Sequence, residues 1–354
     1  CPCALSLATP TALAASTGAL AKDGILISGK QSLETLAQID DVVFDKTGTL
    51  TKGQLSVSRM LSAGRLNEAQ ALAIAQALEQ QSEHPIARAI LNHTLSDGPV
   101  SALDVKVQQR VNRIGHGVSA QIELDGETQV WALGKAAFVS EIAGNLPETF
   151  AHIDHTGGII FLGNQSGFQT AFLLEDQIKD SAAEMLQNLK QHGIRLHLLS
   201  GDRQAAVAQV AQELGLDAYR AEATPEDKLA YVENMQKQGR KVMMIGDGIN
   251  DAPVIAQADV SAAVATSADV ARDGADVVLL NDDLNVLPVM MEQARLTHQI
   301  IRQNLTWASA YNLVAVPLAV FGYVTPWIAA LGMSFSSLLV LGNALRLLKT
   351  KKAV

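Results

Sequence analysis

The stretch Asp-Val-Val-Phe-Asp-Lys-Thr-Gly-Thr, residues 41–49, decides the fold of this chain. Its apolar centre between two carboxylates, followed by a glycine-containing turn, predicts a short buried strand at 41–45. A second predicted strand, residues 241–245, is followed by Gly-Asp-Gly-Ile-Asn-Asp at 246–251. Ligands of open α/β sheets bind at the carboxyl ends of the strands. We therefore expect both motifs at one edge of a sheet, although they are far apart in the sequence.

The sequence after about residue 176 alternates between short apolar runs and amphipathic segments. The apolar runs predict strands at 194–199, 241–245, 259–264 and 276–280. The amphipathic segments predict helices, among them 179–192 and 203–214. Alternation of strands and helices is typical of a doubly wound parallel sheet, so the expected fold class is α/β.

Residues 53–170 interrupt this alternation with a different pattern. Helical periodicity occurs at 67–81 and 85–95, and alternating strands follow around an Asp125-Gly126 turn. These features predict a separate α+β domain that is inserted into the first domain.

The charge distribution predicts a membrane protein with a large soluble insert. Apolar residues make up 48% of the chain, and neither residues 1–21 nor residues 303–345 contain Asp, Glu, Lys, Arg or His. A spanning helix needs about 20 apolar residues. Residues 303–345 therefore fit two spans that fold back at 322–326, and residues 1–21 look like the last part of a third span.

Basic residues flank the predicted pair of spans, at Arg295, Arg302, Arg346, Lys349, Lys351 and Lys352. The positive-inside tendency then places the soluble insert in the cytoplasm. We expect an integral protein in contact with lipid, in a bacterial plasma membrane. The net charge is −9, and no cluster of basic residues in the sequence suggests a basic face. Nucleic acid is therefore not an expected partner.

The predicted strand ends carry residues suited to phosphoryl transfer. Asp45, Asp247 and the Ser-Gly-Asp turn at 200–202 are expected at the same edge of the sheet. Two carboxylates there can share a Mg²⁺ ion, a hard cation that takes oxygen ligands and keeps substrate phosphate in its shell. One carboxylate can then attack the γ-phosphate of ATP, because the metal neutralises the repulsion.

Each motif taken alone has a simpler interpretation. Asp-Lys-Thr-Gly-Thr could be a polar turn after a strand, and Gly-Asp-Gly could be a tight loop. Between them stands Lys228, at the end of Thr-Pro-Glu-Asp-Lys (224–228), as a candidate cation facing the phosphate. The combination favours a phosphoryl-transfer site.

Residues 45–49 and 246–251 resemble the phosphorylation domain of P-type ATPases, within the haloacid-dehalogenase superfamily. The resemblance implies that Asp45 is phosphorylated and that Asp45, Thr47 and Asp247 hold Mg²⁺. The implied catalytic set is Asp45, Lys46, Thr47, Thr49, Ser200, Gly201, Asp202, Lys228, Asn250 and Asp251. Ser200 replaces the Thr that usually precedes Gly-Asp in the family, and we expect its role to persist because a hydroxyl remains.

A phosphatase of the same superfamily, anchored to a membrane, is the alternative from another class. Such enzymes resemble this chain but place a second Asp two residues after the nucleophile, as a general acid/base for dephosphorylation. That position is Thr47 here. Without the base an aspartyl phosphate should persist, which suits a machine that couples it to a conformational change.

The inserted domain carries Ser-Glu-His-Pro at 82–85. A histidine that caps a proline-initiated helix is the simple interpretation. In heavy-metal P-type ATPases, however, a similar motif belongs to the ATP-binding domain. The implied nucleotide-binding set is Glu79, Glu83, His84, Pro85, Gly115 and Gly117. Gly134-Lys135 departs from the more usual Gly-Asn of the family, so Lys135 is not included.

Cys1-Pro2-Cys3 opens the first span, and two thiolates are soft ligands that select Cu(I) or Zn. The stretch resembles the sixth transmembrane helix of heavy-metal P-type ATPases. Resemblance to the copper-transporting subclass implies a Cu(I) site formed by Cys1, Cys3, Tyr311, Asn312, Met333 and Ser337. A zinc or cadmium transporter is the alternative, but that subclass is expected to carry a Lys and an Asp in the last spans. For Ser336 we favour a role in helix packing.

The resemblance divides the chain into six segments. Residues 1–21, 300–322 and 326–346 are expected transmembrane helices, 22–52 and 171–290 the two parts of the phosphorylation domain, and 53–170 the nucleotide-binding domain. In the complete protein we expect an additional N-terminal portion with an actuator domain, and a copper chaperone as a partner. The expected activity is ATP-driven Cu(I) transport, by family analogy export from the cytoplasm.

Overall fold

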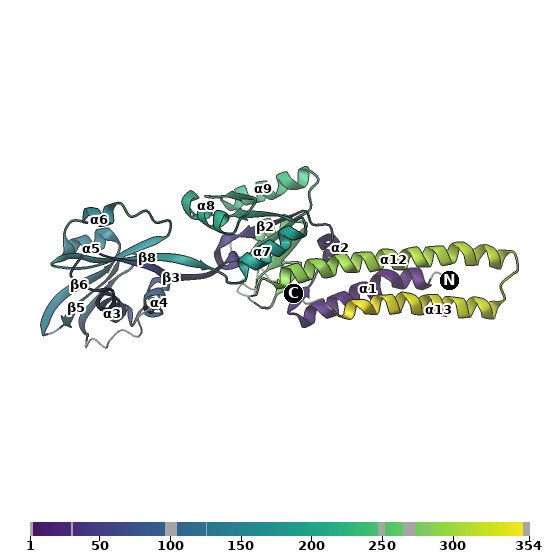
Figure 1. Cartoon of the computed structure of the whole chain (residues 1–354), viewed down its shortest axis with the longest axis horizontal. Coiled ribbons are helices and arrows are strands. Elements are labelled where there is room, and N and C mark those ends of the chain that lie inside the picture. The colour runs from purple at the N-terminus through teal and green to yellow at the C-terminus, as the bar shows by residue number, and fades with distance from the viewer. Residues whose placement is uncertain are drawn as a thin grey trace. The chain divides into compact units, whose positions relative to one another are not determined.

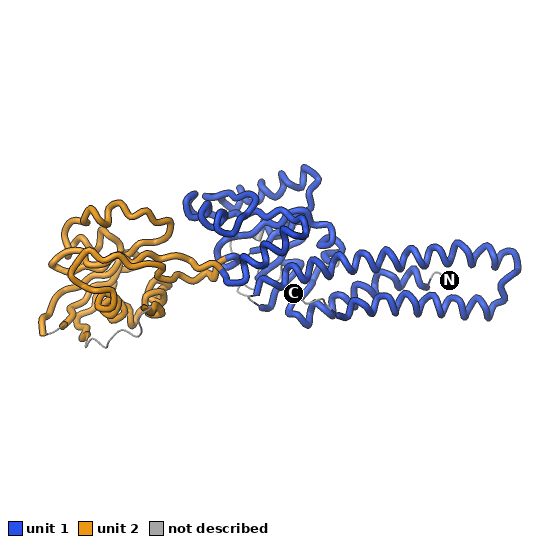
Figure 2. The backbone as a smooth tube through the Cα atoms, in the orientation of Figure 1, with its two compact units in different colours: residues 1–50, 179–354 blue, residues 51–178 orange. Residues whose placement is uncertain are grey.

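The computed structural model describes residues 3–29, 31–95, 105–124, 126–246, 252–264, 274–281 and 283–349. Two compact units are present (Figure 2). Unit 1 comprises Cys1–Leu50 and Lys179–Val354, and unit 2 comprises Thr51–Ile178.

Unit 1 contains a seven-stranded sheet in the order β1-β13-β12-β11-β2-β9-β10. In this order the strands are Ile25–Ile27, Val277–Leu279, Val260–Ala263, Val242–Gly246, Asp41–Asp45, Arg195–Leu199 and Ala218–Arg220. All neighbours pair in parallel except β1 and β13, which are antiparallel. The predicted α/β fold with a doubly wound parallel sheet is confirmed.

Helices alternate with these strands, as the sequence pattern predicts. They are α2 (Ser32–Leu36), α7 (Ala182–Gln191), α8 (Gln204–Glu213), α9 (Pro225–Lys237) and α10 (Ala252–Gln257) (Figure 1). β2 lies between β11 and β9, and its Val42, Val43 and Phe44 are completely buried. A continuous apolar run is what a parallel strand covered on both faces requires.

A buried charge cluster surrounds the amino end of β2. The Asp41 carboxylate accepts hydrogen bonds from Arg195 Nε and Nη2, each at 3.0 Å, from Arg240 Nε at 2.6 Å, and contacts His197 Nε2 at 2.8 Å. His197 Nδ1 lies 3.0 Å from the Tyr231 hydroxyl. Burial alone would raise the pKa of Asp41, but the bonds from Arg240, His197 and Arg195 hold it below 3.8. Burial lowers the pKa of His197 and raises that of Tyr231.

Unit 2 is built on a six-stranded antiparallel sheet in the order β3-β8-β7-β6-β5-β4. Its strands are β3 (Thr51–Ser62), β4 (Lys106–Arg113), β5 (Gly117–Leu124), β6 (Glu127–Gly134), β7 (Gly158–Asn164) and β8 (Gly167–Ile178). Its helices are α3 (Glu68–Glu79), α4 (Pro85–Leu91), α5 (Ala136–Ala143) and α6 (Glu148–Ala151).

Alternate side chains along the strands of this sheet pack into two separate hydrophobic cores, one on each face. Trp131 and Leu133 pack with the apolar faces of α3 and α4, whereas Ala132 between them packs with Phe138 and Phe150 from α5 and α6. This is the period of two that a strand imposes on its side chains. Each face of the sheet is therefore covered by its own pair of helices.

Three long helices complete unit 1: α1 (Cys3–Lys22), α12 (Val286–Val320) and α13 (Pro326–Ala344), followed by the short η2 (Leu345–Leu348). They lie side by side and contact one another (Figure 1). The segments Cys3–Lys22 and Pro326–Leu348 are long and apolar enough to cross a membrane.

Polar side chains join these helices to one another. Thr297 Oγ1 donates to Ser16 Oγ at 2.8 Å, and Trp307 Nε1 donates to Ser336 Oγ at 3.2 Å. Ser336 is 1% exposed. Interhelical hydrogen bonds of this kind hold helices together where water is absent, which supports the packing role expected for Ser336.

The Asp41 cluster generates a stability prediction. Asp41→Asn should lower the free energy of opening β2 by about 3–5 kcal/mol, because it removes the buried charge that Arg240 and Arg195 both bind. Arg195→Gln should cost about 1 kcal/mol or less, because the Arg195 side chain is 53% exposed and solvent replaces the lost bond. Hydrogen exchange of β2 amides in the detergent-solubilised chain measures both. Equal losses for the two variants would contradict the account.

Candidate functional site

Asp45 ends β2 beside a lysine from a distant part of the chain. Lys228 Nζ donates a hydrogen bond to Asp45 Oδ1 at 2.6 Å, and the two side chains are only 7% and 11% exposed. Lys228 lies in the first turn of α9, whose start is fixed by a capping box between Thr224 and Asp227. The bonds from Thr224 hold the pKa of Asp227 below 3.8. Removing either Asp45 or Lys228 would break this buried ion pair.

The turn after β9 adjoins this pair, because β9 pairs in register with β2. Ser200 is buried, and its backbone N–H donates to the carbonyl of Arg220 at 3.0 Å. Its hydroxyl accepts a hydrogen bond from the backbone N–H of Asp202 at 3.2 Å, across the exposed Gly201. The Asp202 carboxylate forms an ion pair with Lys46. The predicted residues of both strand ends therefore meet in one place.

The turn Lys46–Leu50 leaves one hydroxyl exposed and one buried. Thr47 is exposed in an extended conformation, and Gly48 follows with φ = 71°, a left-handed value that favours glycine. Thr49 is completely buried, and its Oγ1 has no hydrogen-bond partner in the described part of the chain. Buried hydroxyls are normally satisfied, so this turn retains unused hydrogen-bonding capacity.

β11 ends at the same edge, since it pairs in parallel with β2 and Ile245 lies opposite Phe44. Asp247, Asn250 and Asp251 directly follow this strand and lie outside the described residues. Their predicted roles stay predictions.

The arrangement can perform one kind of chemistry in particular. A buried carboxylate held by a lysine has its oxygens fixed in position, so it can act as a nucleophile towards a phosphoryl group. Lys228 and Lys46 provide positive charge for the phosphate oxygens. Carboxylate and hydroxyl oxygens at Asp45 and Thr47 are also the donor type that Mg²⁺ prefers.

A second group of predicted residues lies in unit 2, where α3 ends and α4 begins. His84 caps α4: its Nδ1 accepts a hydrogen bond from the backbone N–H of Ile86 at 3.2 Å, and Pro85 occupies the first turn. In the neutral imidazole the proton is then on Nε2, on an exposed side chain next to the exposed Glu83. Burial raises the pKa of Glu79, although a hydrogen bond from Ser82 opposes this.

The two predicted glycines of the β4–β5 turn differ in their surroundings. Gly115 has φ = +77° and open space where a Cβ would project. Gly117 instead faces Gly134 of β6 across the sheet, with no room for a Cβ between the two backbones. Lys135 N donates to the carbonyl of His116 at 2.9 Å. Gly134 and Lys135 thus adjoin this turn. Gly134 is not among the residues predicted for the site, and the only sequence signal for it is that the residue is a glycine.

The predicted soft-metal residues of the described chain are on α1, α12 and α13. Cys3, Tyr311, Asn312, Met333 and Ser337 are all partly buried, while Cys1 lies outside the described residues. A small apolar cluster of Ala4, Ala8, Ala308 and Val340 joins the three helices next to these positions in sequence.

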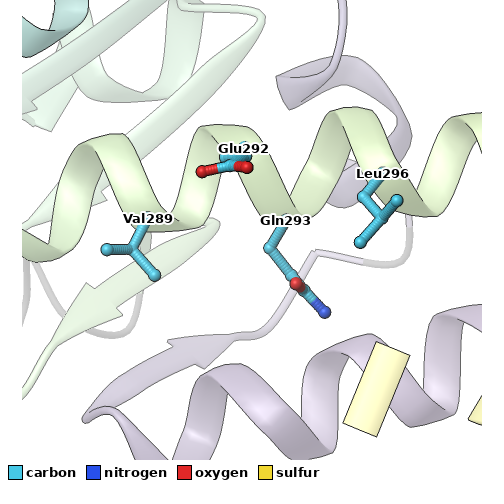
Figure 3. A pocket seen from close by; sticks show the side chains of 4 residues that line it. All are labelled: Val289, Glu292, Gln293 and Leu296. Atoms are coloured by element: carbon cyan, nitrogen blue, oxygen red, sulfur yellow. The ribbon is translucent and has the colours of Figure 1, made fainter. Parts of the chain in front are cut away.

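A small surface hollow lies along α12 and is lined by Val289, Glu292, Gln293 and Leu296 (Figure 3). It contains none of the residues predicted for phosphoryl transfer, nucleotide or metal. The Gln293 amide already donates to the carbonyl of Leu347 at 2.9 Å. The hollow is therefore not the candidate site.

The haloacid dehalogenase-like hydrolase family matches residues 39–259. The chain is 39% identical over 356 residues to the cation-transporting P-type ATPase B of Mycobacterium bovis, covering 98% of this chain and 46% of that protein. It is 36% identical over 354 residues to a copper-exporting P-type ATPase of Bacillus subtilis, covering 99% and 43%. It thus spans about half the length of the curated relatives it matches.

The chain is similar to a solved structure of a zinc-transporting PIB-type ATPase in its E2.Pi state. The similarity covers 99% of this chain and 56% of the solved chain. The TM-score is 0.85 and the sequence identity is 32%. Both copper and zinc therefore occur among the similar proteins.

The glycine environments generate the second prediction. Gly117→Ala should destabilise unit 2 by about 3 kcal/mol, because the new Cβ would collide with the Leu133 carbonyl and lie 2.8 Å from Gly134 Cα. Gly115→Ala should cost about 1 kcal/mol, from its left-handed backbone alone. Unfolding followed by Trp131 fluorescence, with Trp307 and Trp327 replaced by Phe, measures the difference. A Gly115 variant as unstable as the Gly117 variant would refute the claim that only Gly117 lacks room for a Cβ.

Proposed function

Because the chain belongs to the haloacid dehalogenase-like hydrolase family and, within it, to the heavy-metal P-type ATPases, we propose that Asp45 accepts the γ-phosphoryl group of ATP in the complete protein. The observation that carries the proposal is the hydrogen bond of 2.6 Å between Lys228 and the buried Asp45 carboxylate. It joins a carboxylate at the end of the central strand to a cation suited to phosphate oxygens.

Residues around Asp45 have separate roles in this proposal. Lys228 orients the carboxylate and faces the arriving phosphate. Lys46, fixed by Asp202, adds a second positive charge. Ser200, whose hydroxyl already shapes its turn, lies where a phosphate oxygen could accept a hydrogen bond. The buried Thr49 Oγ1, which has no hydrogen-bond partner among the described residues, keeps this turn able to form a further hydrogen bond.

Magnesium fits this set of residues. Asp45, Thr47 and Asp247 would hold it, since carboxylate and backbone or hydroxyl oxygens are its usual ligands. When bound, Mg²⁺ would neutralise charge on the phosphate and on the attacking carboxylate. Asn250 and Asp251, next to Asp247 in the sequence, would support the same loop.

ATP is proposed to bind in unit 2. Glu79, Glu83, His84 and Pro85 surround the junction of α3 and α4, where the His84 Nε2–H is available to a ligand. Gly115 leaves open space at the tip of the β4–β5 turn, so a nucleotide could approach the backbone there. Gly117 would contribute by letting β5 and β6 approach each other.

Cu(I) is the proposed transported ion, and Zn(II) is the alternative. Cys1, Cys3 and Met333 offer sulfur, and Tyr311, Asn312 and Ser337 offer oxygens that carry no charge. Such a set holds few negative charges and favours a monovalent soft ion over a divalent one. The relatives support both ions, because they include a copper exporter and a zinc transporter.

The setting follows from the same family. The complete protein would lie in a bacterial plasma membrane, with unit 2 and the seven-stranded sheet of unit 1 in the cytoplasm, receive copper from a chaperone and export it. The alternative of a membrane-anchored phosphatase has no support among the similar proteins described above, which are P-type ATPases.

The nucleophile generates the third prediction. The full-length protein should form a phosphoenzyme from γ-labelled ATP that is stable in acid and cleaved by hydroxylamine, since a carboxylate gives an acyl phosphate. Asp45→Asn should abolish the label. Asp154→Asn, on an exposed residue of unit 2, should keep it. Full labelling of the Asp45 variant would refute the proposal.

Ligand softness generates the fourth prediction. ATPase activity of the full-length protein should be stimulated by Cu(I) or Ag(I) and only weakly by Zn(II). Cys3→Ser should abolish this stimulation, and Met333→Ala should lower the metal affinity, because a thioether is a weaker ligand than a thiolate. Ser334→Ala, one position from Met333 but exposed, should leave it unchanged. Equal stimulation by Zn(II) would make the copper proposal wrong.

A further inference from the structure

Arg110 is a partly buried cation of unit 2. It belongs to β4, and its Nη2 donates a hydrogen bond to the carbonyl of Ala77 at 2.6 Å. Its Nε and Nη1 are also buried, and neither has a hydrogen-bond partner in the part of the chain that the structure describes. Burying a cation with unused donors is costly. One backbone carbonyl does not offset that cost, so another interaction must favour the charge.

The second interaction is electrostatic. Glu79 is partly buried and lies two residues after Ala77, at the end of α3. The groups that act on it are Arg110, a cation on β4, and His84, in the loop that follows α3, which is a cation only when protonated; the Ser82 side chain adds a hydrogen bond. Burial raises the pKa of Glu79, whereas Ser82, His84 and Arg110 oppose that rise.

Arg110 therefore acts on α3 and on its neighbouring loop together. A cation bonded to a carbonyl in the last turn of a helix is favoured by the helix dipole and fixes the place where the helix ends. The chain leaves α3 directly into the loop that carries Ser82 and His84, where the Ser82 N–H bonds to the Glu79 carbonyl at 2.8 Å. Fixing the end of α3 thus also fixes this loop.

We infer that Arg110 is a positioning residue of the nucleotide site: its bond to the Ala77 carbonyl anchors the last turn of α3, and with it Glu79 and the loop that carries Ser82 and His84. The inference rests on the nucleotide site proposed for unit 2. A protonated Glu79 would present a donor in place of one acceptor, so nucleotide affinity should decline as Glu79 takes up a proton.

The sign of the expected pH effect follows from the charge of Arg110. Its removal withdraws a stabilising neighbour from the Glu79 carboxylate, so Glu79 is protonated at higher pH. The acid limb of ATP affinity should then move to higher pH. A lysine at this position retains the positive charge and should keep the limb close to that of the unchanged chain.

The experiment is calorimetric titration of the full chain with ATP across a range of pH, for Arg110→Gln, Arg110→Lys, Glu79→Gln and the double variant Arg110→Gln/Glu79→Gln. Arg110→Gln should weaken binding severalfold near the acid limb and shift that limb upward, whereas Arg110→Lys should not shift it. Glu79→Gln should remove the Glu79 contribution, so that adding Arg110→Gln shifts nothing further. Arg59→Gln, an exposed arginine on β3, is the charge-matched control.

Three results would overturn the inference. If Arg110→Gln weakens ATP binding equally at every pH and equally with Glu79→Gln present, Arg110 is only a structural residue. If Arg110→Lys shifts the acid limb as Arg110→Gln does, the positive charge of residue 110 is not what positions the site. If circular dichroism shows that Arg110→Gln does not fold, the acid limb of Arg110→Lys tests the inference in its place. If Glu79→Gln and His84→Gln both leave ATP binding unchanged, the proposed nucleotide site itself is wrong and the inference falls with it.

Discussion

Burial of a carboxylate at each end of β2 is the constraint on which unit 1 depends. The strand lies inside the parallel sheet, so water cannot solvate the carboxylates of Asp41 and Asp45, and each requires cations from other elements. Asp41 obtains them from Arg195 on β9 and from Arg240 before β11, and Asp45 from Lys228 on α9. The two carboxylates thereby join segments far apart in the sequence around one strand.

The two ends differ in what else surrounds them, and that difference separates structure from chemistry. Asp41 is enclosed by two arginines and a histidine, and its side chain is 0% exposed. Asp45 stands where the strands end in turns, next to an exposed Thr47 and a left-handed Gly48. A carboxylate beside exposed turns at a strand end can meet a ligand, whereas one enclosed by three basic side chains cannot. The same residue type thus stabilises one edge of the sheet and can react at the other.

Local pattern was enough to predict much of this fold. The strands at β2, β9, β11, β12 and β13 follow from short apolar runs, and their parallel pairing follows from the helices between them. The long β3 and β8 were not predicted, because their pairing joins the two ends of the insert and no local signal records it. The Lys228–Asp45 bond, the Asp41 cluster and the role of Arg110 likewise depend on contacts between distant residues. Sequence could nominate Lys228 and Glu79 by motif, but not the distant residues that surround them.

The account stands most directly on the identity of the phosphorylated atom. Full-length protein incubated with ATP, quenched in acid and reduced with borohydride should yield homoserine at position 45, because an acyl phosphate is reduced to an alcohol while a free carboxylate is not. Mass spectrometry of the peptide that spans β2 should find this residue with one oxygen lost and two hydrogens gained relative to Asp45. Reduction at Asp202 or Asp247 with Asp45 intact, or a phosphate retained on a Ser or Thr hydroxyl, would contradict it.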